Sequence, residues 1–463
     1  MLNYIWLAFL LISVVVGGIL GKLPEMTKGV FETASDAVMK IALPLVGIMA
    51  IWLGIMRLAE RSGLVQLIAR ALRPLMRLLF PEVPADHPAM GAMVMNMAAN
   101  MLGLGNAATP LGLRAMALLE KLNPRPGTAT NAMCTFLAIN TASIQLVPTT
   151  AIAILAVNHS TNPTAIVLPA FLATCVAACS GVIAAKVLER LPWFRLAPIA
   201  PAIEGPNREA KAESLAEKVE VEQVEVPPLS PLAALGLILF GGAFVLMFAQ
   251  LVWISQWATP ETIAAQPWWL RMLWFAPLPD LVGKPWELRM LLGVSILAVP
   301  FLLSFFPLYA ALRRVKVYEQ FVEGAKEAFA VGQRIIPFLV AMLVAVRMLR
   351  EAGVIALLTQ ALTPVLNFLH FPADLLPMVL MRPLSGSGTQ GLFVELVQHL
   401  GADNIVSKMA ATIYGSTETT FYVIAVYFGS VAVRQTRHAV IAGLTADTIA
   451  VVASITICRL LLS

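Results

Sequence analysis

Apolar runs long enough to cross a bilayer occur along most of the chain, and they restrict its fold more than any other feature. A membrane-spanning helix needs about 20 mostly apolar residues. Only 13% of the residues are charged, whereas soluble domains contain about 25%. We therefore predict an all-α polytopic membrane protein with about nine spanning helices. The runs are 2–20, 41–59, 129–156, 163–188, 232–255, 288–310, 335–349, 407–430 and 439–461.

Two polar, glycine-rich stretches interrupt apolar segments, at 103–112 and 383–391. Hydrocarbon offers no water to an unpaired backbone amide, so irregular backbone at membrane depth persists only where protein buries it or where it lines a cavity. We expect each stretch to form the tip of a re-entrant helical hairpin. Paired breaks in two halves of a transporter-like chain indicate a binding site between them.

The chain divides into two related halves on either side of an acidic, proline-bracketed segment. An offset of 290 aligns Arg57 with Arg347 and Pro74 with Pro364, and both halves follow the order span, amphipathic helix, broken hairpin, polar-interrupted span, final span. The predicted domains are a first repeat, an acidic cytoplasmic linker, two extra transmembrane helices with a Trp-rich outer loop, and a second repeat. Their bounds are 1–192, 193–231, 232–312 and 313–463.

The charges flanking these elements predict that the two repeats are inverted in the membrane. Arg70, Arg73 and Arg77 share one face of the first amphipathic helix, but the second has Gln360, Thr363 and Asn367 at these positions. The loop 158–163 lacks Lys and Arg, whereas its counterpart 433–438 contains two arginines. Because cytoplasmic loops are enriched in Lys and Arg, equivalent elements face opposite sides. We expect the first helix to be retained rather than cleaved as a signal peptide. Counting spans from a cytoplasmic N-terminus then also places equivalent elements of the two halves on opposite sides of the membrane.

Several other functions find no support in the sequence. Gly386-Ser-Gly-Thr-Gln-Gly391 matches a dinucleotide fingerprint by its letters, but it lacks the strand and βαβ unit that the fingerprint requires. The basic residues lie at the ends of apolar runs and form no nucleic-acid patch. The five histidines do not cluster, and the four cysteines lack metal-type spacing. With no hydrolase signature or P-loop, we expect neither an enzyme nor a bound cofactor or metal.

Two acidic residues inside apolar runs are candidate functional groups. Glu418 lies in Ile413-Tyr-Gly-Ser-Thr-Glu-Thr-Thr-Phe-Tyr422, and an acid near the bilayer centre costs roughly 2.5 to 3.5 kcal/mol on insertion scales. Such a residue either contacts substrate or carries a coupling proton, or it forms a structural pair, for which Arg382 is the candidate. Asp447 is a second candidate coupling acid, on weaker grounds.

Neutral polar residues near the breaks complete the candidate substrate site. Thr109 and Thr389 lie near expected helix starts, where free backbone amides can bind a solute. The carboxamides of Asn96, Asn100, Asn106 and Asn131 suit either solute binding or hydrogen bonding between membrane helices. The candidate substrate-binding residues are Asn106, Thr109, Asn140, Thr141, Ser143, Ser385, Ser387, Thr389, Glu418 and Thr420.

The same residues resemble known families. Residues 1–192 resemble the bacterial spore maturation protein A family, and residues from about 315 to 463 resemble the protein B family, so the chain looks like a fusion of the two. Both belong with the nucleoside-recognition "gate" domains, similar to parts of concentrative nucleoside transporters and of the ferrous iron transporter B. In that resemblance both tips are solute-facing hairpins. The matching runs include 87–92, 100–113, 130–140, 316–319, 321–327, 382–388 and 415–422.

Residues and resemblance together lead us to expect a transporter-like protein of the bacterial inner membrane that moves a small polar solute, with nucleosides as one possible class. A proton or a sodium ion is the candidate coupling ion, the bilayer is the surrounding partner, and a homo-oligomer is left open. The alternative is a membrane scaffold or assembly partner in cell-envelope or spore maturation that does not transport.

Overall fold

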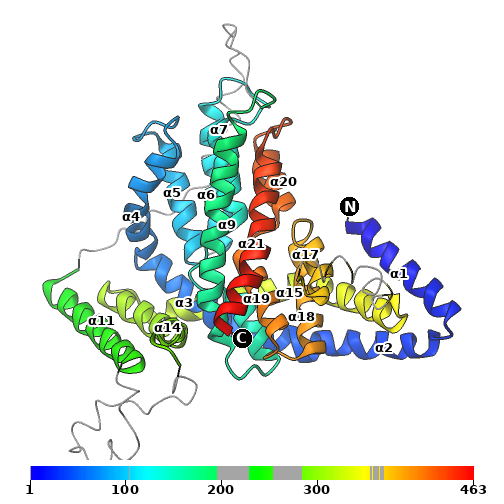
Figure 1. The fold of residues 1–463 in the computed structure, drawn as a ribbon. Coiled ribbons are helices and arrows are strands. Elements are labelled where there is room, and N and C mark those ends of the chain that lie inside the picture. Colours follow the sequence, from blue (N-terminus) through cyan, green and yellow to red (C-terminus); the bar gives the residue numbers. More distant parts are fainter. Residues whose placement is uncertain are drawn as a thin grey trace, which may run out of the picture.

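The computed structural model describes residues 2–103, 105–194, 229–253, 284–354, 357, 364, 366 and 370–462 (Figure 1). Helices form nearly all of this part, and within it no strand occurs beyond an isolated bridge between Thr128 and Gln435. The prediction of an all-helical chain is therefore confirmed. Most of the predicted acidic linker and outer loop, and the positions Gln360, Thr363 and Asn367, lie outside the described residues.

The helices follow the order that the hydrophobic pattern indicates. Those before the linker are α1 (Leu2–Ile19), α2 (Leu23–Asp36), the π-helix η1 (Ala37–Ala42), α3 (Leu43–Arg61), α4 (Leu64–Leu79), α5 (Pro88–Met101), α6 (Gly105–Lys121), α7 (Asn131–Ala142), α8 (Thr149–Val157), η2 (Pro163–Ile166) and α9 (Val167–Leu188). Those after it are α11 (Pro231–Val252), α14 (Trp286–Leu312), α15 (Val317–Glu351), η5 (Ala373–Leu375), α17 (Leu376–Met381), α18 (Gly386–Leu400), α19 (Ile405–Ser416), α20 (Thr420–Ser430) and α21 (Ala439–Leu462).

Six helical stretches of the described chain are long and apolar enough to cross a membrane. Two of them are longer than the expected runs at 41–59 and 335–349, because helix continues into flanking segments that carry charges. The expected runs at 129–156 and 407–430 are each divided into two shorter helices, as the polar interruptions indicated. The six stretches are Leu23–Arg61, Pro163–Leu188, Pro231–Val252, Trp286–Leu312, Val317–Glu351 and Ala439–Leu462.

Small side chains allow the central helices α7, α9 and α21 to pack closely, and these helices stand side by side in Figure 1. A Cβ at Gly181 of α9 would lie 3.1 Å from the Cβ of Ala446 of α21. Alanines 138, 142, 177, 185, 442 and 450 in the same three helices are fully buried. Membrane helices gain little from hydrophobic burial against each other, so close backbone approach through small residues is their usual means of association.

A second close approach joins α3 to α15. A Cβ at Gly54 would lie 2.6 Å from the ring of Phe321 and 2.8 Å from its carbonyl oxygen. A Cβ at Gly324 would lie 2.6 Å from the carbonyl oxygen of Leu53. These two glycines therefore let the two backbones meet without an intervening side chain.

Contacts at the ends of the central helices define their directions. Arg437, just before α21, donates to the carbonyl of Phe194 beyond α9, and its Nη1 lies 2.8 Å from Oδ1 of Asn131 at the start of α7. At the opposite end, Asp403 before α19 accepts a 3.0 Å hydrogen bond from the amide of Thr161, which precedes α9. Thus α9 and α21 are antiparallel, and α7 and α19 enter the centre from opposite ends.

We predict that Gly54→Ala destabilises the protein, whereas Gly47→Ala in the same helix does not. The new methyl group at position 54 meets Phe321, while nothing lies within 4 Å of a Cβ at Gly47. Overpacking typically costs about 1–3 kcal/mol. Thermal unfolding of the two variants in detergent tests this, and equal midpoints would contradict the close packing of α3 on α15.

We also predict that the contact of Asp403 with the 158–162 loop stabilises the fold in a pH-dependent way. Burial alone would raise the pKa of Asp403, but the amide of Thr161 and the hydroxyl of Ser160 favour the ionised form and hold this pKa below its usual range. The contribution is present above the unfolded pKa of about 3.9 and is lost as pH falls through the lower folded value.

Asp403→Asn should therefore lower the unfolding midpoint at neutral pH, and the difference from wild type should shrink in strongly acidic buffer. Asp86→Asn is the control, since the side chain of Asp86 is 94% exposed. A loss of stability at position 403 that does not change with pH would contradict the role of the charge.

Candidate functional site

The centre of the molecule contains two interruptions of helix that lie against each other. In the first, α7 ends at Ala142, Ser143 has a left-handed φ of 43°, and α8 begins only at Thr149. In the second, residues 417–419 separate α19 from α20. The amide of Glu418 donates a 2.7 Å hydrogen bond to the carbonyl of Thr141. Each interruption thus helps to satisfy backbone groups that the other leaves unpaired.

The Glu418 side chain lies beside the first interruption and is partly exposed. Its Oε1 is 3.4 Å from the hydroxyl of Ser143, which in turn lies 3.3 Å from Nε2 of Gln145. Among the described ion pairs, none joins Glu418 to Arg382. The structural-pair alternative for Glu418 therefore has no direct contact to support it.

Asp447 lies close to the same point, in α21, and only 5% of its surface is exposed. Its Oδ2 accepts a 2.5 Å hydrogen bond from the hydroxyl of Thr420, the first residue of α20. One turn before it, a Cβ at Gly443 would lie 2.9 Å from Cγ2 of Thr420 and 3.4 Å from Oγ1 of Thr141. This glycine therefore allows α21 to lie against both interruptions.

The second hairpin places its tip against the second interruption. Ser385 caps α18, since its hydroxyl accepts a 3.0 Å hydrogen bond from the amide of Gly388. The Thr389 hydroxyl donates to the carbonyl of Ser385, and the Ser385 and Ser387 hydroxyl oxygens are 3.4 Å apart. A Cβ at Gly386 would lie 2.9 Å from Oγ1 of Thr419.

Arg382, at the same tip, is buried with only 4% of its surface exposed and binds the end of α19. Its Nε donates to Oγ1 of Thr417 at 2.9 Å, and its Nη2 donates to the carbonyls of Tyr414, at 3.1 Å, and Thr417. The guanidinium carbon lies 4.9 Å from the centre of the Tyr414 ring. A cation at a helix C-terminus compensates both the unpaired carbonyls and the negative end of the helix dipole.

Each hairpin tip also makes a backbone hydrogen bond to the nearby interruption. In the first half the amide of Leu146 donates to the carbonyl of Met101 at 2.9 Å, and in the second half the amide of Phe421 donates to that of Pro383 at 3.0 Å. In each half the contact joins a hairpin tip to the interruption that follows it in the chain. The breaks expected at 103–112 and 383–391 thus both reach the centre.

Around the first tip, asparagines join helices to one another. Nδ2 of Asn100 donates to Oδ1 of Asn140 at 2.9 Å, and the Tyr427 hydroxyl lies 3.3 Å from the same oxygen. Nδ2 of Asn96 donates to the carbonyl of Ala108 at 2.8 Å. Asn131 lies away from the centre, near Arg437. For Asn96 and Asn100 these contacts favour the helix-bonding interpretation.

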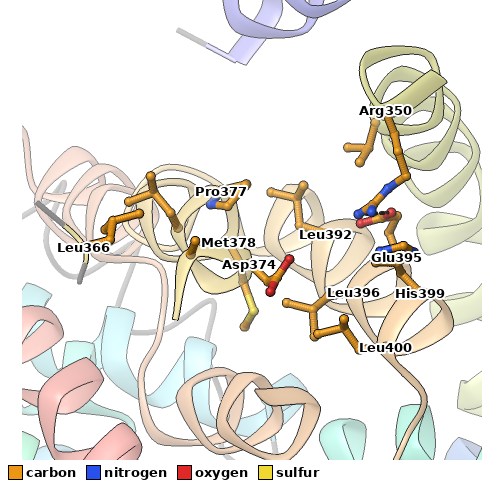
Figure 2. A pocket seen from close by; sticks show the side chains of 13 residues that line it. Arg350, Leu366, Asp374, Pro377, Met378, Leu392, Glu395, Leu396, His399 and Leu400 are labelled. Carbon is orange, nitrogen blue, oxygen red and sulfur yellow. Dashed lines mark ion pairs between the residues drawn. The ribbon is translucent and has the colours of Figure 1, made fainter. Parts of the chain in front are cut away.

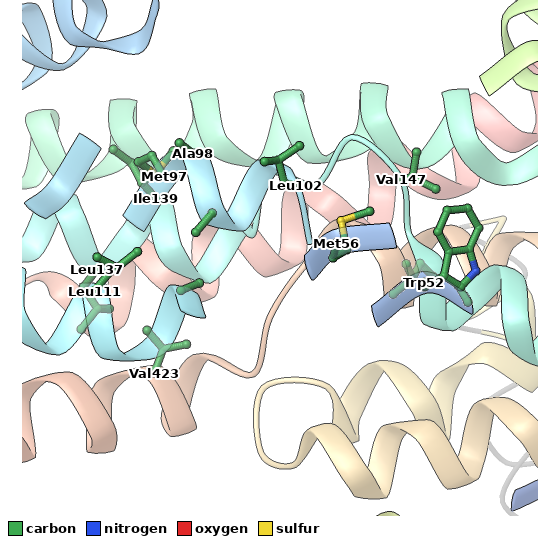
Figure 3. Close-up of a cluster of buried hydrophobic side chains, with 14 of the residues drawn as sticks. Trp52, Met56, Met97, Ala98, Leu102, Leu111, Leu137, Ile139, Val147 and Val423 are labelled. Atoms are coloured by element: carbon green, nitrogen blue, oxygen red, sulfur yellow. The ribbon is translucent and has the colours of Figure 1, made fainter. Parts of the chain in front are cut away.

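Apolar side chains surround the first interruption. Figure 3 shows Leu102 of the first tip and Val147 of the interruption in one buried cluster with Trp52 and Met56 of α3. Apolar side chains therefore border the polar crossing, which is the place where the two interruptions meet. Their low dielectric strengthens electrostatic interactions beside them.

A separate hollow lies at the base of the second hairpin, between α15, α17 and α18 (Figure 2). Its walls are mostly apolar, and its polar groups include Arg350, Asp374 and His399 together with Glu395. Nη2 of Arg350 lies 2.6 Å from Oε1 of Glu395, so these two charges neutralise each other. This hollow is distinct from the crossing, and none of the predicted site residues lines it.

The structure brings together Asn140, Thr141, Ser143, Glu418 and Thr420, with Asp447 against them, and it puts the Ser385 tip beside the second interruption. Thr109 lies in α6 and is partly exposed, and the side chain of Asn106 lies outside the described residues. Within the described chain, no group of three His, Cys, Asp or Glu residues is placed to hold a metal ion.

Sequence reasoning missed the role of Arg382 and did not single out Tyr427. Two of the four acceptors of Arg382 are backbone carbonyls, which carry no signal in the sequence. Tyr427 appears there as one aromatic residue among many in an apolar run. In the sequence, the one indication of the role of Arg382 is that a cation lies at the tip of a predicted membrane hairpin.

Comparison with known proteins extends these observations. The family model described as "Nucleoside recognition" (Gate) matches residues 42–189 and 333–434. Spore maturation protein A of Bacillus subtilis (strain 168) is 43% identical over 195 residues, covering 42% of this chain and 97% of that protein. Spore maturation protein B of the same organism is 39% identical over 168 residues, covering 36% of this chain and 94% of that protein. No solved structure matches.

We predict that Arg382→Met strongly lowers thermal stability, while Arg382→Lys has a smaller effect. Methionine leaves the buried carbonyls of Tyr414 and Thr417 without a donor, and each such group costs about 1–3 kcal/mol. Lysine keeps the charge but cannot reproduce the planar set of donors. Thermal unfolding in detergent measures both variants, and a wild-type midpoint for Arg382→Met would exclude this capping role.

Proposed function

Because the chain belongs to the Gate family of nucleoside-recognition membrane proteins and unites relatives of spore maturation proteins A and B, we propose that it is a transporter of a small polar solute. The proposed site is the crossing of the two helix interruptions. The chain is a multi-pass membrane protein, and the solute would cross the membrane through this site.

The observation that carries the proposal is the 2.7 Å hydrogen bond between the Glu418 amide and the Thr141 carbonyl. Irregular backbone at membrane depth is tolerated where it lines a polar cavity or is buried by protein. Here two interruptions from distant parts of the chain meet, and a partly exposed carboxylate lies beside them. Discontinuous helices meeting at mid-membrane are typical of substrate sites in secondary transporters.

The proposed architecture consists of two inverted gate repeats, 1–192 and 313–463, around nine spanning segments. The opposite directions of α7 and α19, and of α9 and α21, support the inversion. A hydrogen bond from the interruption to the hairpin tip in each half, from Leu146 to Met101 and from Phe421 to Pro383, supports the repeat. The linker 193–231 and the two extra helices in 232–312 then connect the repeats, with the linker and the N-terminus in the cytoplasm of a bacterial inner-membrane protein.

Alternating access supplies the mechanism in this proposal. The subdomain that bears both hairpins moves against the rest, and the tip contacts at Met101 and Pro383 separate as it moves. Similarity to concentrative nucleoside transporters suggests this motion for the gate repeats. Movement of either tip exposes the crossing to one side of the membrane at a time.

The solute contacts would come from both halves. Asn106, Thr109, Asn140, Thr141 and Ser143 supply neutral hydrogen bonds from the first. Ser385, Ser387, Thr389 and Thr420 supply hydroxyls from the second, and Glu418 adds a carboxylate. Nucleosides, with several hydroxyl groups and ring nitrogens, fit such a set. Glu418 and Asp447 remain the candidate coupling groups for a proton or sodium ion, and a homo-oligomer is compatible with this arrangement.

The second candidate function is a membrane scaffold or assembly partner that has lost transport. The names of both relatives, spore maturation proteins A and B, favour it, since they describe a developmental process and no solute. In this reading the polar crossing holds the helices together without opening.

Glu418→Gln separates the two functions. We predict that the variant folds normally but loses at least tenfold in solute flux, because the amide removes the partly exposed carboxylate beside the two interruptions. Glu319→Gln, whose side chain is 62% exposed in wild type, is the control and should retain flux. Uptake of labelled nucleosides and small carboxylates into proteoliposomes under proton and sodium gradients is the measurement.

The solutes for that assay come from a thermal-shift screen of the purified full chain. A ligand present at 100 times its dissociation constant stabilises a protein by about 2.7 kcal/mol. Two results together would establish the scaffold function instead. Wild-type protein would move none of the solutes under either gradient, and Glu418→Gln would keep the partner complex and the cellular phenotype of wild type.

A further inference from the structure

We propose that Asp447 binds an exchangeable proton and is neutral in the conformation seen here. This inference rests on the proposed transport function, and it selects Asp447 rather than Glu418 as the group that carries the coupling proton. The proton would attach to Oδ1, because Oδ2 already accepts the hydroxyl hydrogen of Thr420.

Burial of Asp447 leaves little to stabilise a negative charge. Only 5% of its surface is exposed, and Oδ1 is buried without any hydrogen-bond partner in the described structure. An ionised carboxylate in such surroundings costs far more than a neutral acid, unless it is paired and fully hydrogen-bonded. A single hydroxyl donor does not meet that condition.

The elements packed around Asp447 provide few charges to compensate it. Glu418, in the second interruption, and Arg382, at the second hairpin tip, are the charged groups that act on it. The donors of Arg382 are directed to Tyr414, Thr417 and Thr419. Toward α21, α7 presents Thr141 next to Gly443, and α9 presents alanines and Gly181. Burial of the carboxyl group, rather than a neighbouring charge, therefore favours the protonated form of Asp447.

A proton fits this site better than a sodium ion. Hard cations such as calcium and magnesium are held by six or more oxygen ligands, with sites built from several carboxylates, carbonyls and waters. The described contacts of Asp447 provide only its own two oxygens and the hydroxyl of Thr420. A proton needs one carboxylate oxygen, and Oδ1 is the free one.

The position of Asp447 links the proton to movement of the site. Thr420 begins α20 directly after the second interruption, and the tip of the second hairpin is bonded to the next residue, Phe421. If the hairpin and the start of α20 shift, the Thr420 hydroxyl leaves Oδ2 and water can reach the carboxyl group. Release of the proton would then accompany opening, and its return would accompany closure.

Infrared difference spectroscopy of the purified full chain tests the proton directly, without a known solute. As the pH is stepped from mildly acidic to alkaline, wild type should lose the carbonyl stretching band of a protonated, buried carboxyl group. Asp447→Asn should lack this band, and Glu418→Gln should keep it. Thr420→Val removes the hydroxyl that donates to Oδ2 of Asp447, so its band should persist to higher pH.

Thermal unfolding gives an independent measurement that also reports folding. Wild type should lose stability between mildly acidic and alkaline buffer as the buried acid is forced to ionise, and Asp447→Asn should remove this dependence. A band that survives in Asp447→Asn, or that disappears in Glu418→Gln, would overturn the assignment. So would stabilisation of wild type by sodium chloride, but not choline chloride, that Asp447→Asn abolishes.

These readouts separate this inference from the transport proposal. A protonated Asp447 in a chain that moves no solute would contradict transport alone. Flux that requires Glu418, in a protein with no protonated band at Asp447, would contradict the proton assignment alone.

Discussion

Pairing of the backbone where the two helix interruptions meet is the constraint on which this structure depends. A membrane helix that is interrupted exposes several amides and carbonyls that hydrocarbon cannot pair. The protein solves this by placing one interruption against another, so that the amide of Glu418 meets the carbonyl of Thr141. The hairpin tips add Met101 and Pro383 as further acceptors. Polar backbone and side-chain groups are therefore gathered at the crossing because the backbone of each interruption has to be paired there.

The two halves meet these requirements by different means. At the C-terminus of α7, the Thr174 hydroxyl of α9 donates to the carbonyls of Ala142, at 2.6 Å, and Ser143. At the C-terminus of α19, a buried arginine performs this role and brings a positive charge with it. Both acids at the crossing, Glu418 and Asp447, also belong to the second half. The charged residues around the crossing thus come from the second half, whereas the first half contributes neutral polar groups.

Much of this arrangement could be predicted from the sequence, because length, polarity and glycine content act locally. Polar residues inside apolar runs predict both interruptions, and the rarity of acids in such runs singles out Glu418 and Asp447. The sequence could not show that Arg382 would turn away from Glu418 toward the carbonyls of α19. That depends on the end of one helix lying beside a distant loop. The full length of α15 was also missed, since its first turns carry charges typical of an exposed segment.

The alanine and glycine contact between α9 and α21 has a consequence for how such proteins can be made. Each helix belongs to a different half, and small residues of both helices are buried where the helices meet. A half synthesised separately would have to find its complement before this contact could form. Joining the halves in one polypeptide replaces that search with an encounter inside a single molecule, and it fixes their ratio at one to one.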